Sequence, residues 1–69
     1  MAVAQIEKII QTDRGTAIHA RDLRGILYKF SACPLVYMGA TSPKIGLWVT
    51  LTQLENRPYG FKANKAISA

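Results

Sequence analysis

The chain has 69 residues, of which 49% are hydrophobic, so it can form one small domain around a single core. Nine lysines and arginines against four acids give a net charge of +5, and a chain with this balance attracts polyanions. No apolar run approaches the roughly 18 residues that a membrane-spanning helix requires, and no secretory signal is recognisable at the start, so we expect a cytoplasmic protein that contacts no membrane.

Residues 2–11 are predicted to form a short amphipathic helix. Apolar side chains repeat at helical spacing along one side of this segment, and polar side chains occupy the other side. The apolar set is Val3, Ile6, Ile9 and Ile10. Residues 12–16 follow as a turn by composition, because Gly15 can adopt positive φ and Thr16 can cap the next segment.

Residues 20–30 are predicted to form a second helix with two chemically opposite faces. The face expected to pack on the core has the i, i+3, i+4, i+7 spacing, with Leu23, Ile26, Leu27 and Phe30. The opposite face carries Arg21, Arg24, Gly25 and Tyr28. This basic face has two interpretations: a surface that contacts a polyanion, or a solvated helix face.

The character of the chain changes after residue 30, because Pro34 disfavours a helix at the preceding residue. Residues 35–38 and 47–50 are predicted as two short strands of a hairpin, joined by a loop over residues 39–46 that carries Lys44. Two overlapping capping boxes predict a short helix over residues 50–55. Residues 57–69 contain lysine and arginine but no acid, and we expect a basic tail that is extended or mobile.

The order helix, turn, helix, strand, loop, strand, helix predicts an α+β fold, a small winged helix-turn-helix with two or three short helices and a β-hairpin wing. The winged-helix domain would span residues 1–56, with the basic tail at 57–69. In this interpretation the recognition helix covers about residues 19–30 and the wing covers residues 39–46. The expected DNA contacts are Arg14, Arg21, Arg24, Tyr28, Lys29 and Lys44.

Residues 30–39, the polar loop and residues 47–55 together resemble a passage of phage excisionases, of related MerR-type domains and of pyocin-activator-like regulators. The resemblance covers about residues 16–56. It implies a winged fold and a small regulator of transcription or recombination in a phage or mobile element, bound to double-stranded DNA. Two positions depart from the family pattern: Tyr28 is the only possible equivalent of an aromatic residue in the recognition helix, and the wing lacks an arginine. A homodimer, or cooperative binding along adjacent sites, is expected, because one such module has little interface.

A second hypothesis is a small phage-type inhibitor or adaptor that binds a host protein and no nucleic acid. Its contact surface would be the hairpin with Trp48, or the segment from Tyr59 to Phe61. Single-stranded RNA binding, ribosome association and structural roles also remain open, since the basic tail would suit a single strand.

Catalysis is not expected from this sequence. His19 is the only histidine, the four acids are scattered, and Cys33 is the only cysteine, so no spacing indicates an acid–base pair, a nucleophile or a metal site. Neither type of phosphate-binding glycine motif is present. We therefore expect no enzyme activity, no cofactor and no metal.

Overall fold

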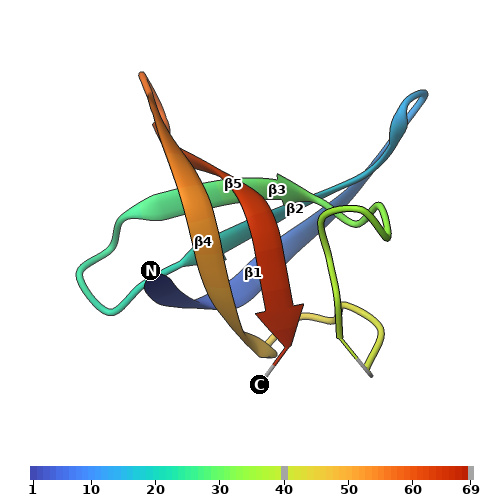
Figure 1. Cartoon of the computed structure of the whole chain (residues 1–69), viewed down its shortest axis with the longest axis horizontal. Coiled ribbons are helices and arrows are strands. Elements are labelled where there is room, and N and C mark those ends of the chain that lie inside the picture. The colour runs from blue at the N-terminus through green and yellow to red at the C-terminus, as the bar shows by residue number, and fades with distance from the viewer. Residues whose placement is uncertain (40, 69) are drawn as a thin grey trace.

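A computed structural model describes residues 1–39 and 41–68 of the chain. These residues form five strands and no helix: β1 (Ala2–Thr12), β2 (Gly15–Arg21), β3 (Leu27–Ser31), β4 (Trp48–Arg57) and β5 (Gly60–Ser68). The strands close into a barrel in the order β1-β2-β3-β5-β4, with β4 paired back to β1 (Figure 1). The predicted α+β winged helix-turn-helix is therefore wrong, because both of its main helices are strands.

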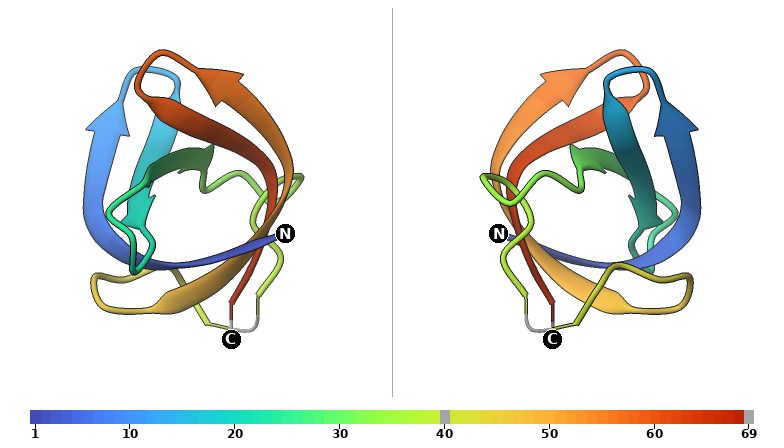
Figure 2. Two further views of the ribbon diagram at one scale, coloured as in Figure 1. Left: turned by 90° about the vertical axis from the view of Figure 1, so that its left-hand side faces the viewer. Right: turned by 90° about the vertical axis from the view of Figure 1, so that its right-hand side faces the viewer.

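One strand pair distinguishes this barrel from a simple meander. β3 and β5 run parallel, with Tyr28 beside Phe61 and Lys29 beside Lys62, whereas the other four pairs are antiparallel. Figure 2 shows the resulting ring of strands, with the β1–β2 and β4–β5 turns projecting from the same side of it. This strand order is that of the oligonucleotide/oligosaccharide-binding (OB) fold, a five-stranded Greek-key barrel.

The first expected helix is β1, and a β-bulge explains why its sequence resembles a helix. Ala4 and Ile6 are buried at the two-residue period of a strand. The pairing with β2 then shifts by one residue between Ile6 and Lys8, so the next core-facing side chain is Ile9. The bulge thus turns a two-residue step into a three-residue step, which is also the spacing of a helix.

The expected recognition helix, residues 19–30, consists of parts of two strands and the turn between them. The pairs Ile18–Phe30 and Ala20–Tyr28 face the core. Leu23, expected in the core, is 91% exposed at the turn. The turn is held by the Asp22 carboxylate, which accepts the backbone N–H groups of Arg24 at 2.9 Å and Ile26 at 3.0 Å.

Gly25 belongs to this turn and has φ of +85°, a left-handed conformation that glycine adopts without strain. In the predicted helix over residues 20–30, Gly25 would lie at the centre, where glycine is unfavourable. Its presence is instead explained by the turn between β2 and β3.

The expected wing, residues 39–46, is part of a long connection between β3 and β4, and residue 40 lies outside the described residues. The expected strand at residues 35–38 is a turn followed by a single parallel bridge from Tyr37 to Ala66. The strand expected at 47–50 is the start of β4. The short helix expected at 50–55 is wrong, because those residues continue β4.

The C-terminal segment expected as a basic tail contains β5, which pairs with β4 over most of its length and with β3 at its start. Residue 69 of that segment lies outside the described residues. β5 also supplies two core residues, Ala63 and Ala66. Gly60 lets β5 begin close to β3, since a Cβ at this position would lie 2.3 Å from the carbonyl oxygen of Leu27.

The core fills the inside of the barrel with aliphatic and aromatic side chains from every strand. Its buried members are Ala4, Ile6, Ile18, Ala20, Tyr28, Phe30, Tyr37, Val49, Leu51, Ala63 and Ala66. Among the described residues, no helix is long and apolar enough to cross a membrane.

Candidate nucleic-acid interface

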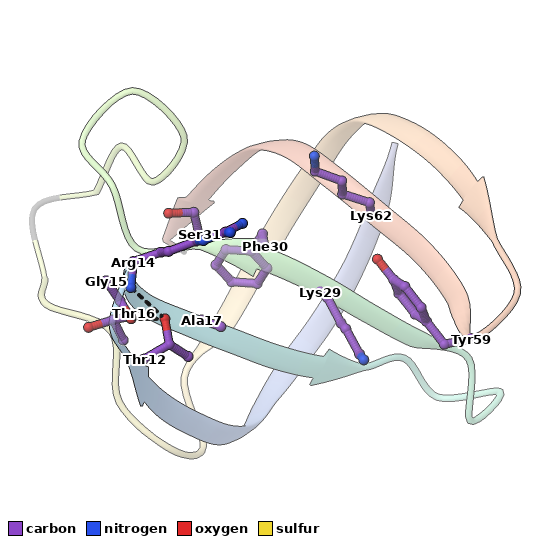
Figure 3. Close-up of a pocket in the computed structure, with 10 residues that line it drawn as sticks. All are labelled: Thr12, Arg14, Gly15, Thr16, Ala17, Lys29, Phe30, Ser31, Tyr59 and Lys62. Atoms are coloured by element: carbon purple, nitrogen blue, oxygen red, sulfur yellow. Dashed lines mark hydrogen bonds between the residues drawn. The ribbon is translucent and has the colours of Figure 1, made fainter.

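A groove of about 260 Å³ lies on the outer side of β2 and β3, between the β1–β2 turn and the β4–β5 turn (Figure 3). The lining residues come from both turns and from four strands: Thr12, Arg14, Gly15, Thr16, Ala17, Lys29, Phe30, Ser31, Tyr59 and Lys62. Three of these described residues are cationic and none is acidic. In OB folds, the face of strands 2 and 3 with these two turns is where oligonucleotides and oligosaccharides bind.

Tyr59 forms the wall of the groove on the side of the β4–β5 turn. Its ring is held by Lys29, whose Nζ lies 4.1 Å from the ring centroid in a cation–π contact. The residue is 39% exposed, so part of its surface remains accessible to a ligand. The groove therefore combines a fixed aromatic platform with a positive charge directly beneath it.

Cations continue across the outside of the barrel from this platform. The strand register places four residues side by side in one row: Lys8 on β1, His19 on β2, Lys29 on β3 and Lys62 on β5. We call these four residues the basic row. It ends at β4, where Glu55 lies opposite Lys62.

His19 reports the positive potential of this row. Burial lowers the pKa of its imidazole below the ordinary value, and the neighbouring charges of Lys29 and Lys8 lower it further. Glu7 acts in the opposite direction and raises the pKa, but does not outweigh these effects. An anion bound along the row would therefore relieve a repulsion that already exists in the free protein.

The structure brings together two of the six residues that the sequence analysis proposed as DNA contacts. Arg14 lies in the β1–β2 turn and Lys29 on β3, and both line the groove. Figure 3 shows the side chain of Arg14 extending from the turn towards Ser31. The other four proposed contacts lie away from the groove.

Arg21 is committed to contacts within the chain. Its guanidinium donates to both carboxylate oxygens of Glu7, at 2.9 and 3.2 Å, and to the carbonyl oxygen of Gly25 at 2.8 Å. These bonds hold the pKa of Glu7 below its usual value, through the Arg21 hydrogen bond first of all.

Arg24 and Tyr28 both approach the same carboxylate, that of Asp22. The Tyr28 hydroxyl donates to it at 3.0 Å, and the Arg24 guanidinium lies 3.7 Å away. Tyr28 is only 2% exposed, and burial followed by the Asp22 hydrogen bond raises the pKa of its phenol. Tyr28 is thus a core residue. Lys44 lies in the β3–β4 connection and does not line the groove.

Two residues of the groove, Tyr59 and Lys62, were not proposed as nucleic-acid contacts, because both fell in a segment expected to be an extended or mobile tail. Tyr59 was named only for the alternative protein-binding surface. Tyr59 occupies a turn between two strands, and Lys62 faces outward on β5. The signal that could have found them is the sequence Pro58-Tyr59-Gly60, a turn between two runs that alternate in polarity. Lys8 and His19 depend on strand register, which the helical interpretation could not provide.

Trp48, the proposed centre of a protein-binding surface, lies half-buried at the start of β4, beside Gln5 of β1. The residue after it, Val49, faces the core, so Trp48 faces outward on another part of the barrel from the groove. Within residues 1–39 and 41–68, no cluster of histidine, cysteine and acidic side chains could hold a metal ion.

No family model, curated protein or solved structure matches this chain. The likeness to the OB fold therefore rests on strand order and on the position of the groove.

Proposed function

We propose that the protein binds single-stranded nucleic acid along the groove and the basic row. The observation that supports this most directly is the platform of Tyr59 over Lys29, set in a groove whose charged lining residues are all cations. Proteins that bind single strands combine these two elements, a positive groove that follows the backbone and aromatic rings on which bases stack. The net charge of +5 adds a general attraction for a polyanion.

The shape of the groove favours a single strand over a duplex. Stacking on Tyr59 requires a base whose face is free, and the bases of a duplex are stacked on one another. Reading a duplex in the major groove requires a helix or β-ribbon that enters it. The described residues form no helix, and the groove is a hollow between two turns. The described residues therefore offer no recognition helix through which the protein could read duplex DNA.

The test is a fluorescence anisotropy titration of a labelled single-stranded dT12. The same titration with a labelled 12-base-pair duplex gives the affinity for double-stranded DNA. We expect wild-type protein to bind the single strand more tightly at low salt. The Tyr59→Ala substitution should weaken that binding about tenfold, because stacking one base on an aromatic ring contributes about 1–3 kcal/mol. Affinity should fall as salt rises, with a logarithmic slope of about −0.7 for each phosphate contacted.

Lys44→Ala provides a matched control for Lys29→Ala, because it removes the same charge at a position outside the groove. We expect Lys29→Ala to reduce the salt slope by about 0.7 and Lys44→Ala to leave it nearly unchanged. Equal effects of the two substitutions would mean that net charge, and not the groove, attracts the strand. Tighter binding to the duplex than to the single strand would contradict the proposal.

A further inference from the structure

The groove has two ends with different chemistry. At the β4–β5 end, Tyr59 and Lys29 form the aromatic platform. At the β1–β2 end lie Ser31, with Ala17 paired opposite it, and the side chain of Arg14 (Figure 3). Lys29 and Ser31 are two residues apart on β3, about 7 Å at the rise of a strand. This is roughly twice the 3.4 Å spacing of stacked bases, so two bases bound at the two ends would not stack on each other.

Small residues make room at the second end. Ala17 and Gly15 both line the groove and extend little or no side chain into it. At about 260 Å³, the groove lies below the roughly 300–1,000 Å³ of pockets that hold drug-sized ligands. Its size therefore suits a flat group such as a base better than a larger ligand.

One hydrogen-bond donor remains free at this end, the hydroxyl proton of Ser31. The Ser31 hydroxyl accepts the backbone N–H of Cys33 at 3.0 Å, and among the described residues its own proton has no acceptor. The proton of Thr12 is used, since this hydroxyl donates to the carbonyl of Gly15 at 2.7 Å and accepts the N–H of Arg14 at 3.2 Å. The same bonds fix the turn from which the Arg14 guanidinium extends.

Resting on the single-strand binding proposed above, we infer that this second end is a guanine-binding subsite formed by Arg14 and Ser31. Guanine presents two adjacent acceptors, O6 and N7, on one edge, and the planar fork of an arginine matches them with two parallel hydrogen bonds. Adenine presents N7 beside an amino donor, so one guanidinium N–H would face another donor. The free proton of Ser31 adds a donor and strengthens this selection. The neighbouring base in the strand stacks on Tyr59.

The inference can be tested with four single-stranded octamers. One contains only thymidine, and in each of the other three a single central thymine is replaced by guanine, adenine or 7-deazaguanine. We expect wild-type protein to bind the guanine octamer about five- to tenfold more tightly than the adenine octamer, the lower range for a bidentate contact. The 7-deazaguanine octamer lacks N7 and should bind with intermediate affinity.

Arg14→Ala removes the guanidinium, and we expect it to abolish the preference for guanine, while the affinity for the thymidine octamer falls only through the loss of one charge. Arg24→Ala is the matched control beyond the other end of β2, and should leave the preference intact. Ser31→Ala should reduce the preference about threefold; circular dichroism verifies its fold, since Ser31 also accepts the N–H of Cys33.

The outcomes separate this inference from the function on which it rests. If all four octamers bind equally tightly to wild-type protein, the guanine subsite is disproved and single-strand binding stands. If none of them binds at low salt, both are disproved. A preference for guanine that persists in Arg14→Ala would also overturn the assignment, because the proposed donors to O6 and N7 would then be absent.

Discussion

The groove and the hollow near the β2–β3 turn differ in how their polar groups are used. The hollow is the larger, at about 410 Å³, and also contains an arginine and a tyrosine, Arg24 and Tyr28. In that hollow, the Asp22 carboxylate accepts a hydrogen bond from the Tyr28 hydroxyl and forms an ion pair with the Arg24 guanidinium. Both groups therefore already have a partner within the chain. In the groove, Arg14, Lys29 and Lys62 make no ion pair within the described residues, and the Lys29 ammonium makes a cation–π contact with Tyr59.

The comparison shows that the size of a hollow does not identify a binding site in this barrel. The described residues contain three ion pairs, and each joins an arginine to an acid: Arg21 to Glu7, Arg24 to Asp22 and Arg57 to Glu55. Three of the four acids thus neutralise arginines at the β2–β3 end and on β4, and none of these three pairs involves a cation of the groove. Surface pairs of this kind add little to stability, but they determine where positive charge remains.

The two tyrosines provide the largest expected contrast. Tyr28→Ala should lower the free energy of unfolding by about 3–5 kcal/mol, because it empties a buried aromatic site and removes one of the hydrogen bonds that the Asp22 carboxylate accepts. Tyr59→Ala should cost less than about 1 kcal/mol, since its ring is partly exposed and held by a cation–π contact. Urea unfolding followed by circular dichroism measures both values. Similar losses would show that Tyr59 is also a structural residue.

A second contrast compares two pairs of cations. Lys29→Ala/Lys62→Ala should weaken binding of single-stranded dT12 about a hundredfold at low salt, through loss of two charge-assisted contacts to phosphate. Arg21→Ala/Arg24→Ala removes the same number of charges, but at residues already paired with acids, and should weaken binding less than about threefold. Anisotropy titrations of both variants under one salt condition make the comparison. A larger loss of affinity in Arg21→Ala/Arg24→Ala than in Lys29→Ala/Lys62→Ala would instead assign the contact surface to the β2–β3 turn.

The smallest expected effect is a dependence on pH. In the free protein, burial lowers the pKa of His19, and the positive charges of Lys29, Lys8 and Arg21 lower it further. Glu7 raises this pKa, but its effect does not outweigh the others. A phosphate chain along the basic row favours the imidazolium, so binding should raise this pKa and take up a proton.

Affinity should therefore increase about two- to threefold as pH falls from 7.5 to 5.5, by linkage between proton and ligand binding. Titrations at fixed salt measure this change, and His19→Gln should remove it. A pH dependence that persists in His19→Gln would show that another group on this face takes up the proton.

The apolar spacing of the sequence predicted two helices, and both segments form strands instead. The reasons lie in β1 and in residues 20–30. The bulge in β1 places core-facing residues at Ala4, Ile6 and Ile9, and the last step equals a helical step. In residues 20–30, the helical pattern depended on Leu23, which the turn exposes to solvent. The turn itself was readable: Asp22 and Gly25 are the residue types that end one strand and reverse the chain.

Prediction of the candidate site was partial for a related reason. Arg14 and Lys29 were proposed as contacts from charge alone, and both lie in the groove. Lys62 was missed, and Tyr59 was considered only for a protein-binding surface, because their place in the groove depends on the parallel pairing of β5 with β3, a contact between distant segments. Local patterns contain no information about that pairing, so the residues that complete the groove could not be grouped from sequence.

The parallel β3–β5 pair also has a kinetic consequence for a growing chain. The first three strands pair only with one another and with strands that follow them in the chain, and Tyr59 and Lys62 come much later. Until β5 is in place, β3 presents an unpaired edge, the kind of edge on which chains aggregate. Closure depends on pairings between distant segments, which fold slowly, in about milliseconds to seconds. A growing chain thus acquires this groove only after β5 is free to pair with β3.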